Sequence, residues 1–403
     1  MRASYFRLLD DRGEIPALDG LRGIAILLVV VYHCVDSFSL DGRALFPVAG
    51  SDLALPLRSG WMGVNLFFVL SGFLITHHLL RRRQRAGGTI NLQHYLAKRF
   101  LRIVPTFYVV LAVAAAGLVP HYEFDRHLIG LQVAWHAIFL QDYFPSSIVG
   151  PFWSLGVEEK FYLIVPVVLL IAWRLPGLRS RLGLLVGIAA IPLVVRIGGW
   201  LAGAAPDVAA LSSDWKNPFH LNLDALFLGA LAAWVRFERE SFPRFDERSA
   251  RRLIRWGTGL ILVLAILPAV TSSRFFFLVP LFPLTALGMF AILFGASLLP
   301  RGGSRLLESR WLARAGRIAY PWYLTHVLVL HWSWGELRAG VLQLDGLGPA
   351  REFALFFPVY FGASIVVALV LHFLIEKPCL LLKDSIGRPR RRANPASCTA
   401  QTA

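Results

Sequence analysis

Two ionisable residues, Arg22 and His33, lie in one apolar stretch that is long enough to cross a membrane as a helix. On a helix their spacing points both side chains the same way, about 16 Å apart along the axis. An arginine can hold phosphates in a fixed fork, and a neutral imidazole can take a proton from a hydroxyl near pH 7. The pair therefore favours chemistry between an anionic donor and a hydroxyl. A structural alternative stays open, in which Arg22 reaches the headgroups and His33 bonds a neighbouring helix.

Three consecutive charges, Glu158, Glu159 and Lys160, stand at the entrance of another apolar stretch that opens at Trp153. One glutamate is predicted to orient His33 or to bind substrate hydroxyls, and the other to pair with Lys160. The alternative is an interfacial charge cluster with aromatic anchors.

Arg99 and Arg102 precede a third apolar stretch and share one helical face. They are expected either to set the topology or to bind the phosphates of a nucleotide-bearing donor. His326 and Glu376 lie in or beside later apolar stretches. Each is expected either to pair with another buried polar group or to take part in catalysis.

These residues require a membrane scaffold to position them. The 403 residues are 56% hydrophobic and only 16% charged, which is too apolar for a soluble domain. Hydropathy predicts an all-α polytopic protein with spans at 17–36, 62–80, 100–119, 154–173, 182–203, 219–236, 254–271, 275–298, 317–335 and 354–375.

The net charge of +16 reflects topology rather than nucleic-acid binding. Of the 41 Lys and Arg residues, 31 fall in alternate connections and 7 in the others. This asymmetry predicts that both termini are cytoplasmic and that Arg22 lies nearer the cytoplasm than His33.

The spans define a membrane domain at 17–378, between a cytoplasmic segment at 1–16 and a basic disordered tail at 379–403. Between the third and fourth spans, residues 128–140 are apolar but too short to cross, so they are expected to be re-entrant or interfacial. Scattered cysteines and missing phosphate-loop, hydrolase and zinc motifs predict no metal and no permanently bound cofactor.

The order of these motifs resembles the membrane acyltransferase-3 family, whose members O-acylate polysaccharides, lipopolysaccharide, lipids and small molecules. The matching elements are Leu18 to Ala25 with His33, Gly63 to Ile75, Arg99 to Pro105, Trp153 to Tyr162, Tyr320 to His326, and Glu376 to Pro378.

The resemblance implies that His33 is catalytic with Glu158 and Glu159, and that Arg22, Arg99 and Arg102 bind the donor. It leaves substrate or structural roles for Asp19, Asn65, Ser71, Trp153, Tyr162, Tyr323, His326 and Glu376. Asn65 stands where the family usually has Asp, which removes one expected charge. The chain is also expected to lack the esterase-like domain that some members carry.

The expected reaction moves an acyl group, with acetyl as the first candidate, from cytoplasmic acyl-CoA to a hydroxyl of a glycan, glycolipid or small molecule. His33 acts as a base or carries the acyl group itself. Membrane lipid is an expected partner in a bacterial inner or plasma membrane, and no protein partner is inferred. A transporter of acylated glycan is the alternative, and a membrane scaffold is a third reading.

Overall fold

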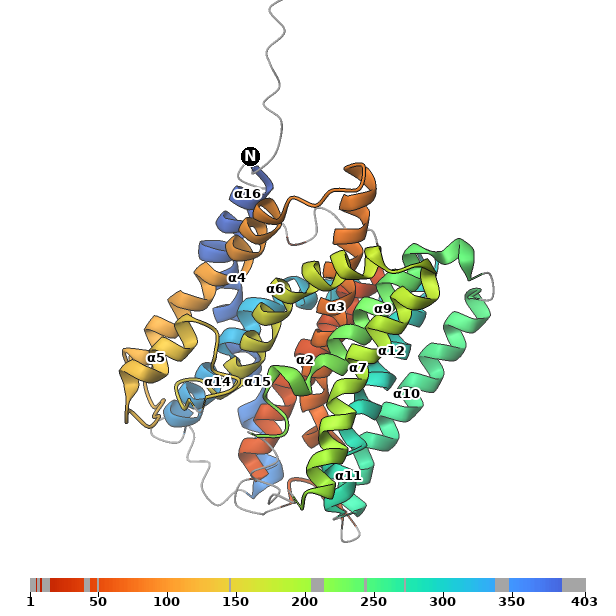
Figure 1. The fold of residues 1–403 in the computed structure, drawn as a ribbon. Helices are drawn as coiled ribbons and strands as arrows, with labels where there is room; N and C mark the ends of the chain where they lie inside the picture. The colour runs from red at the N-terminus through yellow and green to blue at the C-terminus, as the bar shows by residue number, and fades with distance from the viewer. Residues whose placement is uncertain are drawn as a thin grey trace, which may run out of the picture.

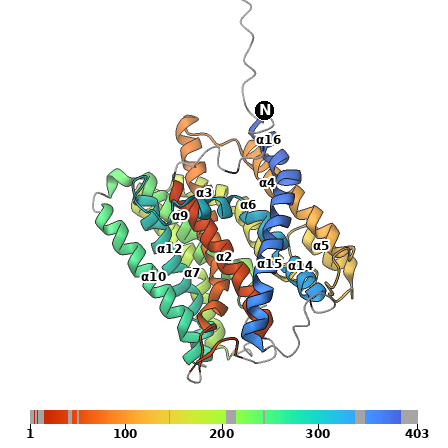
Figure 2. The ribbon, with the colours of Figure 1, turned by 180° about the vertical axis from the view of Figure 1, so that it is seen from behind.

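A computed structural model describes residues 5, 8, 15–39, 44–48, 51–144, 146–203, 214–242, 245–271, 273–337 and 348–385. Its ten longest helices are α2 (Pro16–Ser39), α3 (Met62–Arg85), α4 (Leu92–Ala115), α6 (Trp153–Arg174), α7 (Gly177–Leu201), α9 (Leu223–Phe237), α10 (Glu247–Val270), α12 (Leu281–Leu298), α14 (Ala319–Glu336) and α15 (Pro349–Leu371). In Figures 1 and 2, α2 and α3 run between a group with α4, α5, α14 and α15 and a group with α7, α9, α10 and α12.

Short elements connect the long helices. They are β1 (Pro47–Val48), β2 (Ser51–Asp52), η1 (Leu55–Trp61), α5 (Ile129–Ala137), η2 (Gly150–Phe152), η3 (Phe219–Leu221), η4 (Arg239–Ser241), α11 (Arg274–Leu278), α13 (Arg310–Arg317), the π-helical turn η6 (His372–Glu376) and α16 (Lys377–Ser385). The two strands pair antiparallel. The short helix α5 lies within the apolar segment expected at 128–140.

Each of the ten predicted spans overlaps one of the long helices. The predicted and observed starts differ most where a helix begins with a polar turn. Helix α4 begins at Leu92 rather than at residue 100, because the Asn91 side chain caps it by accepting a backbone N–H at 2.8 Å. Helix α10 likewise begins at Glu247, after the cap Asp246, rather than at residue 254. Hydropathy detects only the apolar part of such helices.

Five helical segments are long and apolar enough to cross a membrane, which indicates a membrane protein. They are Pro16–Phe38, Leu55–Arg85, Gly177–Leu201, Leu281–Leu298 and Pro349–Lys383. The predicted eighth span, 275–298, is divided into α11 and α12 near Pro280. The full set of ten membrane crossings stays a prediction.

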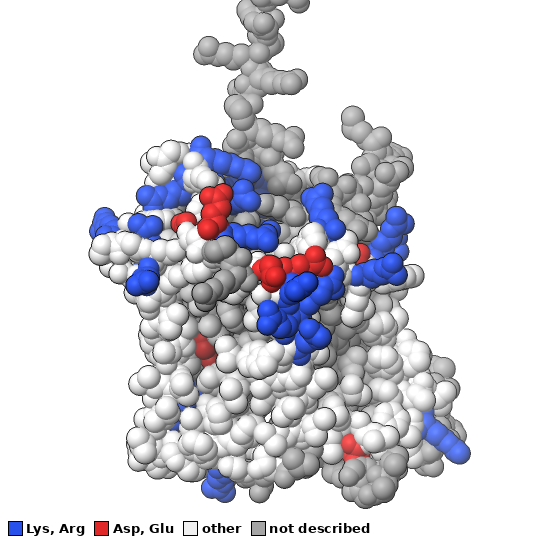
Figure 3. All heavy atoms as spheres, turned by 90° about the vertical axis from the view of Figure 1, so that its right-hand side faces the viewer, with Lys and Arg blue, Asp and Glu red and all other residues white. Residues whose placement is uncertain are grey.

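The first and last described parts of the chain meet at one end of the molecule. The Tyr5 hydroxyl donates a hydrogen bond to the Phe373 carbonyl at 2.6 Å, and the Lys377 ammonium group donates to the Tyr5 carbonyl. Lys and Arg gather towards this end on the face shown in Figure 3, as the charge asymmetry of the sequence predicts. Most of segments 1–16 and 379–403 lies outside the described residues, although α16 continues helically to Ser385.

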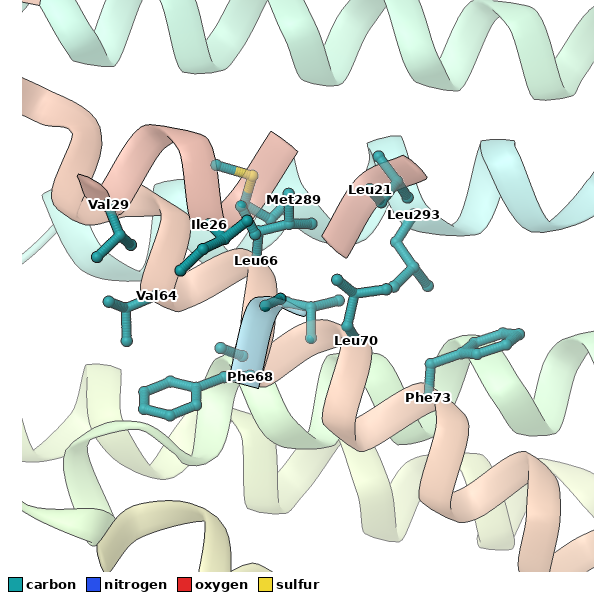
Figure 4. Close-up of a cluster of buried hydrophobic side chains, with 14 of the residues drawn as sticks. Leu21, Ile26, Val29, Val64, Leu66, Phe68, Leu70, Phe73, Met289 and Leu293 are labelled. Atoms are coloured by element: carbon teal, nitrogen blue, oxygen red, sulfur yellow. The ribbon is translucent and has the colours of Figure 1, made fainter. Parts of the chain in front are cut away.

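The core forms where α3 crosses α9 with backbone almost touching backbone. A Cβ atom at Gly72 would lie 2.0 Å from the Leu226 carbonyl oxygen, and one at Gly229 would lie 2.1 Å from that of Val69. Small residues permit such close helix crossings in membranes. Figure 4 shows the apolar cluster that α3 builds with α2 and α12, including Leu21, Ile26, Val29, Val64, Leu66, Phe68, Leu70, Phe73, Met289 and Leu293.

A second close crossing joins α2 to the segment that contains α13. A Cβ atom at Gly20 would lie 1.9 Å from the Leu307 carbonyl oxygen, and one at Gly316 would lie 2.1 Å from that of Asp19. Since real Cβ atoms do not approach oxygen so closely, only glycine fits at these two points. The crossing fixes how α13 lies on the first helix.

The connection between α2 and α3 is organised by one buried carboxylate. Asp52 accepts backbone N–H groups from Leu45 at 3.0 Å, Phe46 at 2.9 Å and Ala54 at 3.0 Å, and pairs with Arg58 at 3.2 Å. Burial alone would raise the pKa of the Asp52 carboxyl, but these three N–H groups and Arg58 hold it below its ordinary value.

Replacing Asp52 by asparagine is expected to lower the free energy of unfolding by about 1–3 kcal/mol at neutral pH, since the loop loses a charge-assisted acceptor. A carboxyl whose pKa is depressed by folding stabilises the native state above its unfolded pKa of about 3.9 and loses that effect as pH falls through its lower folded value. Thermal unfolding in detergent should therefore show a difference between Asp52→Asn and wild type that is constant above about pH 5 and shrinks below pH 4. The exposed Glu123→Gln is the matched control, and a pH-independent difference would contradict this role.

Candidate active site

A cavity opens among α2, α3, α4, α6, α13 and α14, and it contains most of the polar residues that the sequence singles out. Its charged and polar lining comprises Arg22, Ser71, Arg99, Arg102, Ser154, Glu158, Tyr162, Arg317, Tyr320, Tyr323 and Glu376. The rest of the lining is largely apolar, from residues such as Phe67, Leu74 and Ile103. Mixed linings of this kind are typical of small-molecule sites.

Arginines concentrate positive charge in this cavity. Arg22 lies within electrostatic range of Arg99, Arg102 and Arg317, and within the described part of the chain it pairs with the carboxylate of Asp19, at 3.5 Å on the same helix. The Arg99 guanidinium lies 5.4 Å from the centre of the Tyr162 ring. A cavity lined by four arginines and two glutamates is suited to a multiply charged anion.

Glu158 lies in the same cavity, where it organises hydroxyl groups. It accepts hydrogen bonds from Ser71 and Tyr162, both at 2.7 Å, and interacts electrostatically with Arg102 and Arg99. The expected contact between Glu158 or Glu159 and His33 is absent from the hydrogen bonds of the described residues. Glu159 is not among the residues that line the cavity, and its Oε1 atom is buried without a described hydrogen-bond partner.

The predicted pairing of Lys160 with a neighbouring glutamate is wrong. The Lys160 ammonium group donates instead to the carboxylate of Asp142 and to the carbonyl oxygens of Phe139 and Gly156. Asp142 also accepts the backbone N–H of Phe219 at 3.1 Å. Adjacent residues on a helix point in different directions, so Lys160 faces the loop that contains Asp142 rather than its own glutamates.

His33 is paired with His326, from the far end of the sequence. The Nδ1 atom of His33 lies 2.9 Å from the Val29 carbonyl oxygen and 3.2 Å from the Nε2 atom of His326, whose own Nδ1 lies 2.7 Å from the Tyr323 carbonyl oxygen. Because a carbonyl oxygen only accepts, both neutral rings carry their proton on Nδ1. The Nε2 atom of His33 is then left with its lone pair, as a proton acceptor needs.

The histidine pair adjoins the cavity through α14. Tyr323, one helical turn before His326, lines the cavity, and the two rings are 5.6 Å apart. The Tyr323 hydroxyl is fixed by the Pro151 carbonyl at 2.8 Å and by Ser154 at 2.6 Å. Neither His33 nor His326 lines the cavity; the pair lies behind Tyr323, which separates it from the arginines.

The remaining predicted residues have varied positions. Glu376 lines the cavity and bonds His372 at 2.6 Å. Asn65 is buried on α3 and Trp153 packs on Phe68, but neither belongs to the cavity lining. Within the described ranges, no group of three His, Cys, Asp or Glu side chains is placed to hold a metal ion.

Sequence reasoning assigned no site role to three polar cavity residues, Ser154, Arg317 and Tyr320. Arg317 ends α13, and Tyr320 begins α14 with its hydroxyl donating to the Ile103 carbonyl at 2.7 Å. Arg317 was counted only as part of the charge asymmetry.

Residues 15–373 match the model of a family described as an acyltransferase domain. The chain belongs to the acyltransferase-3 family. The matched region includes both histidines and all of the cavity lining except Glu376. Membership supports an enzyme that transfers acyl groups, as expected, rather than a transporter or a scaffold.

Several curated proteins resemble this acyltransferase domain. A peptidoglycan O-acetyltransferase of Listeria monocytogenes is 29% identical over 65% of this chain and 40% of its own length. A Bacillus subtilis protein provisionally named a peptidoglycan O-acetyltransferase is 31% identical over 43% of this chain and 26% of its own length. The matched region thus spans less than half of these relatives. No solved structure matches the chain significantly.

Proposed function

We propose that this protein is an O-acyltransferase that moves an acetyl group from acetyl-CoA to a hydroxyl of a cell-envelope glycan across a bacterial cell membrane. The observation that carries this proposal is the cavity whose arginines lead, through Tyr323, to the His33–His326 pair. The family supports acyl transfer, and the names of the relatives support an acetyl donor and a glycan acceptor.

The arginine end is the proposed donor site. Coenzyme A carries phosphates, and guanidinium groups bind phosphate oxygens in pairs. Arg22, Arg99 and Arg102 would bind these phosphates, with Arg317 beside them, while the pantetheine arm extends along the apolar lining towards Tyr323. The spacing of about 16 Å between Arg22 and His33 along α2 suits such an arm.

The histidine end is the proposed catalytic site. In direct transfer, the Nε2 atom of His33 takes the proton of the acceptor hydroxyl, whose oxygen forms the ester bond to the acyl carbon. The carbon–sulfur bond of the thioester breaks, and the sulfur leaves with the proton as the CoA thiol. His326 acts as a positioning residue, because its Nε2 atom accepts from His33 and keeps the proton on Nδ1.

The proposal is tested by incubating purified protein in lipid vesicles with radiolabelled acetyl-CoA and a glycan acceptor, and separating labelled glycan from donor. We expect label in the glycan as an alkali-labile ester, and none with vesicles alone. Label that stays in acetyl-CoA with every glycan, glycolipid and small hydroxylated acceptor would refute the proposed function.

Replacing Arg22 by alanine is expected to raise the KM for acetyl-CoA by roughly ten- to a hundred-fold, which is the usual effect of losing one charged hydrogen-bonding group. Arg22→Lys should recover part of this loss, since lysine keeps the charge but not the fork. Initial rates at varied donor concentration provide the measurement, with the exposed Arg255→Ala as control. An unchanged KM in Arg22→Ala would remove Arg22 from the donor site.

A further inference from the structure

A lysine lies between two tryptophans on the other side of His33 from the arginines. The Lys216 ammonium nitrogen lies 5.3 Å from the ring centre of Trp61 and 5.8 Å from that of Trp153. All three side chains are half-buried. Among the described residues, this ammonium group has no carboxylate within ion-pairing distance and donates no hydrogen bond. Its described partners are the two ring faces and the more distant Asp36, so the ammonium group is available to an anionic ligand.

Four segments that are distant in the sequence bring these residues to the outer end of the catalytic region. Trp61 ends η1, Trp153 begins α6, and Lys216 precedes η3. Asp36 lies three residues after His33, on the same face of α2. Lys216 lies within electrostatic range of both His33 and Asp36.

The charge state of Lys216 is compatible with anion binding. Burial lowers the pKa of its ammonium group to about 8, so most of the population is still protonated at pH 7. A carboxylate placed beside it would favour the charged form further. A neutral ligand would remove water from the ammonium group without replacing the lost interaction.

We infer that Lys216, Trp61 and Trp153 form the acceptor subsite and that it binds a sugar with a carboxylate near the hydroxyl that is acylated. This inference rests on the proposed function. The flat indole rings offer apolar surface to the C–H face of a sugar ring. Lys216 binds the carboxylate, and Asp36 accepts hydrogen bonds from free hydroxyls. A single compact ammonium group suits a carboxylate, whereas the phosphates belong to the arginine cavity.

The test uses two acceptors that differ in one group, an acidic disaccharide with a free carboxylate and its methyl ester. We expect wild type to have a KM for the acid that is roughly ten- to a hundred-fold lower than for the ester. Lys216→Met should raise the KM for the acid to that for the ester while leaving the KM for acetyl-CoA unchanged. Lys216→Arg should retain part of the preference, and Trp61→Leu should raise the KM for both acceptors.

The exposed Arg351→Met, which removes a cation from the first turn of α15, is the control and should keep the preference for the acid. Equal KM values for acid and ester in wild type would overturn the inference and leave the proposed function intact. An unchanged preference for the acid over the ester in Lys216→Met would also overturn the inference and leave the proposed function intact. No transfer by wild type to any acceptor would overturn both. If Lys216→Met fails to fold, the KM values of wild type for acid and ester still test whether the acceptor subsite prefers a carboxylate.

Discussion

Replacement of His33 by alanine is expected to reduce the turnover number for acyl transfer by roughly 10²- to 10⁴-fold, with little change in the KM for acetyl-CoA. The reason is that the His33 ring, which is paired with His326 next to Tyr323, has its Nε2 atom left as a proton acceptor. In the proposed mechanism, other residues bind the donor phosphates. Transfer of radiolabel at saturating donor, at equal amounts of folded protein, measures the effect.

Two substitutions at His326 separate positioning from structure. His326→Gln keeps an acceptor near the position of Nε2 and should retain more activity than His326→Ala, in turnover number rather than in KM. A merely structural role would lower folded yield in both variants and leave the turnover number per folded molecule unchanged. Full activity in His33→Ala would show that another residue accepts the proton.

Replacement of Gly72 by valine is expected to cost about 3 kcal/mol or more and to abolish folded protein in detergent. A Cβ atom there would lie 2.0 Å from the carbonyl oxygen of Leu226, which is backbone and cannot rotate away. Over-packing a close-packed interior commonly costs about 1–3 kcal/mol, and this clash is with main chain. Helices α3 and α9 would have to separate and would lose the contacts around Phe73 and Leu226.

The matched control for this change is Gly183→Val on α7, where an added Cβ atom meets nothing within 4 Å. Both substitutions place the same β-branched residue in a helix, so intrinsic helix propensity cancels in the comparison. Size-exclusion profiles and melting temperatures of the two variants measure the difference. Equal profiles would mean that α3 and α9 can move apart without loss of the fold.

The helical architecture was predictable because lipid leaves helices as the way to satisfy the backbone of apolar segments. All ten hydropathy maxima coincide with long helices. Positions where polar turns extend a helix were not predictable from hydropathy, as the starts of α4 and α10 show. Those starts depend on the capping side chains of Asn91 and Asp246, and a hydropathy average over a window of residues does not detect a cap.

The candidate site was predictable as a set of residues but not as a set of contacts. Arg22, Arg99 and Arg102 share a cavity, as a common donor site requires. The partner of His33 was missed because His326 lies 293 positions away and only tertiary packing brings them together. One of Glu158 and Glu159 was expected to orient His33 or to bind substrate hydroxyls, yet Glu158 accepts hydrogen bonds from Ser71 and Tyr162 beside the arginines. Tertiary packing sets which groups meet at the start of α6, and the sequence pattern does not encode it. The oblique course of α6 is visible in Figure 1.

The glycine contacts between α2 and α13 have a consequence for how a donor is recognised. Arg22 is on α2 and Arg317 is on α13. Helix α2 contacts α13 at Gly316, and the segment before α13 at Gly20, backbone to backbone, so the backbone positions of the two arginines are fixed before any ligand arrives. A preorganised anion site binds without the entropic cost of closing around its ligand. Such a site is also selective, because a donor whose charges are spaced differently cannot pull the two helices to new positions. If acetyl-CoA is the donor, as proposed, its selection depends in part on the packing of glycines, which have no side chain.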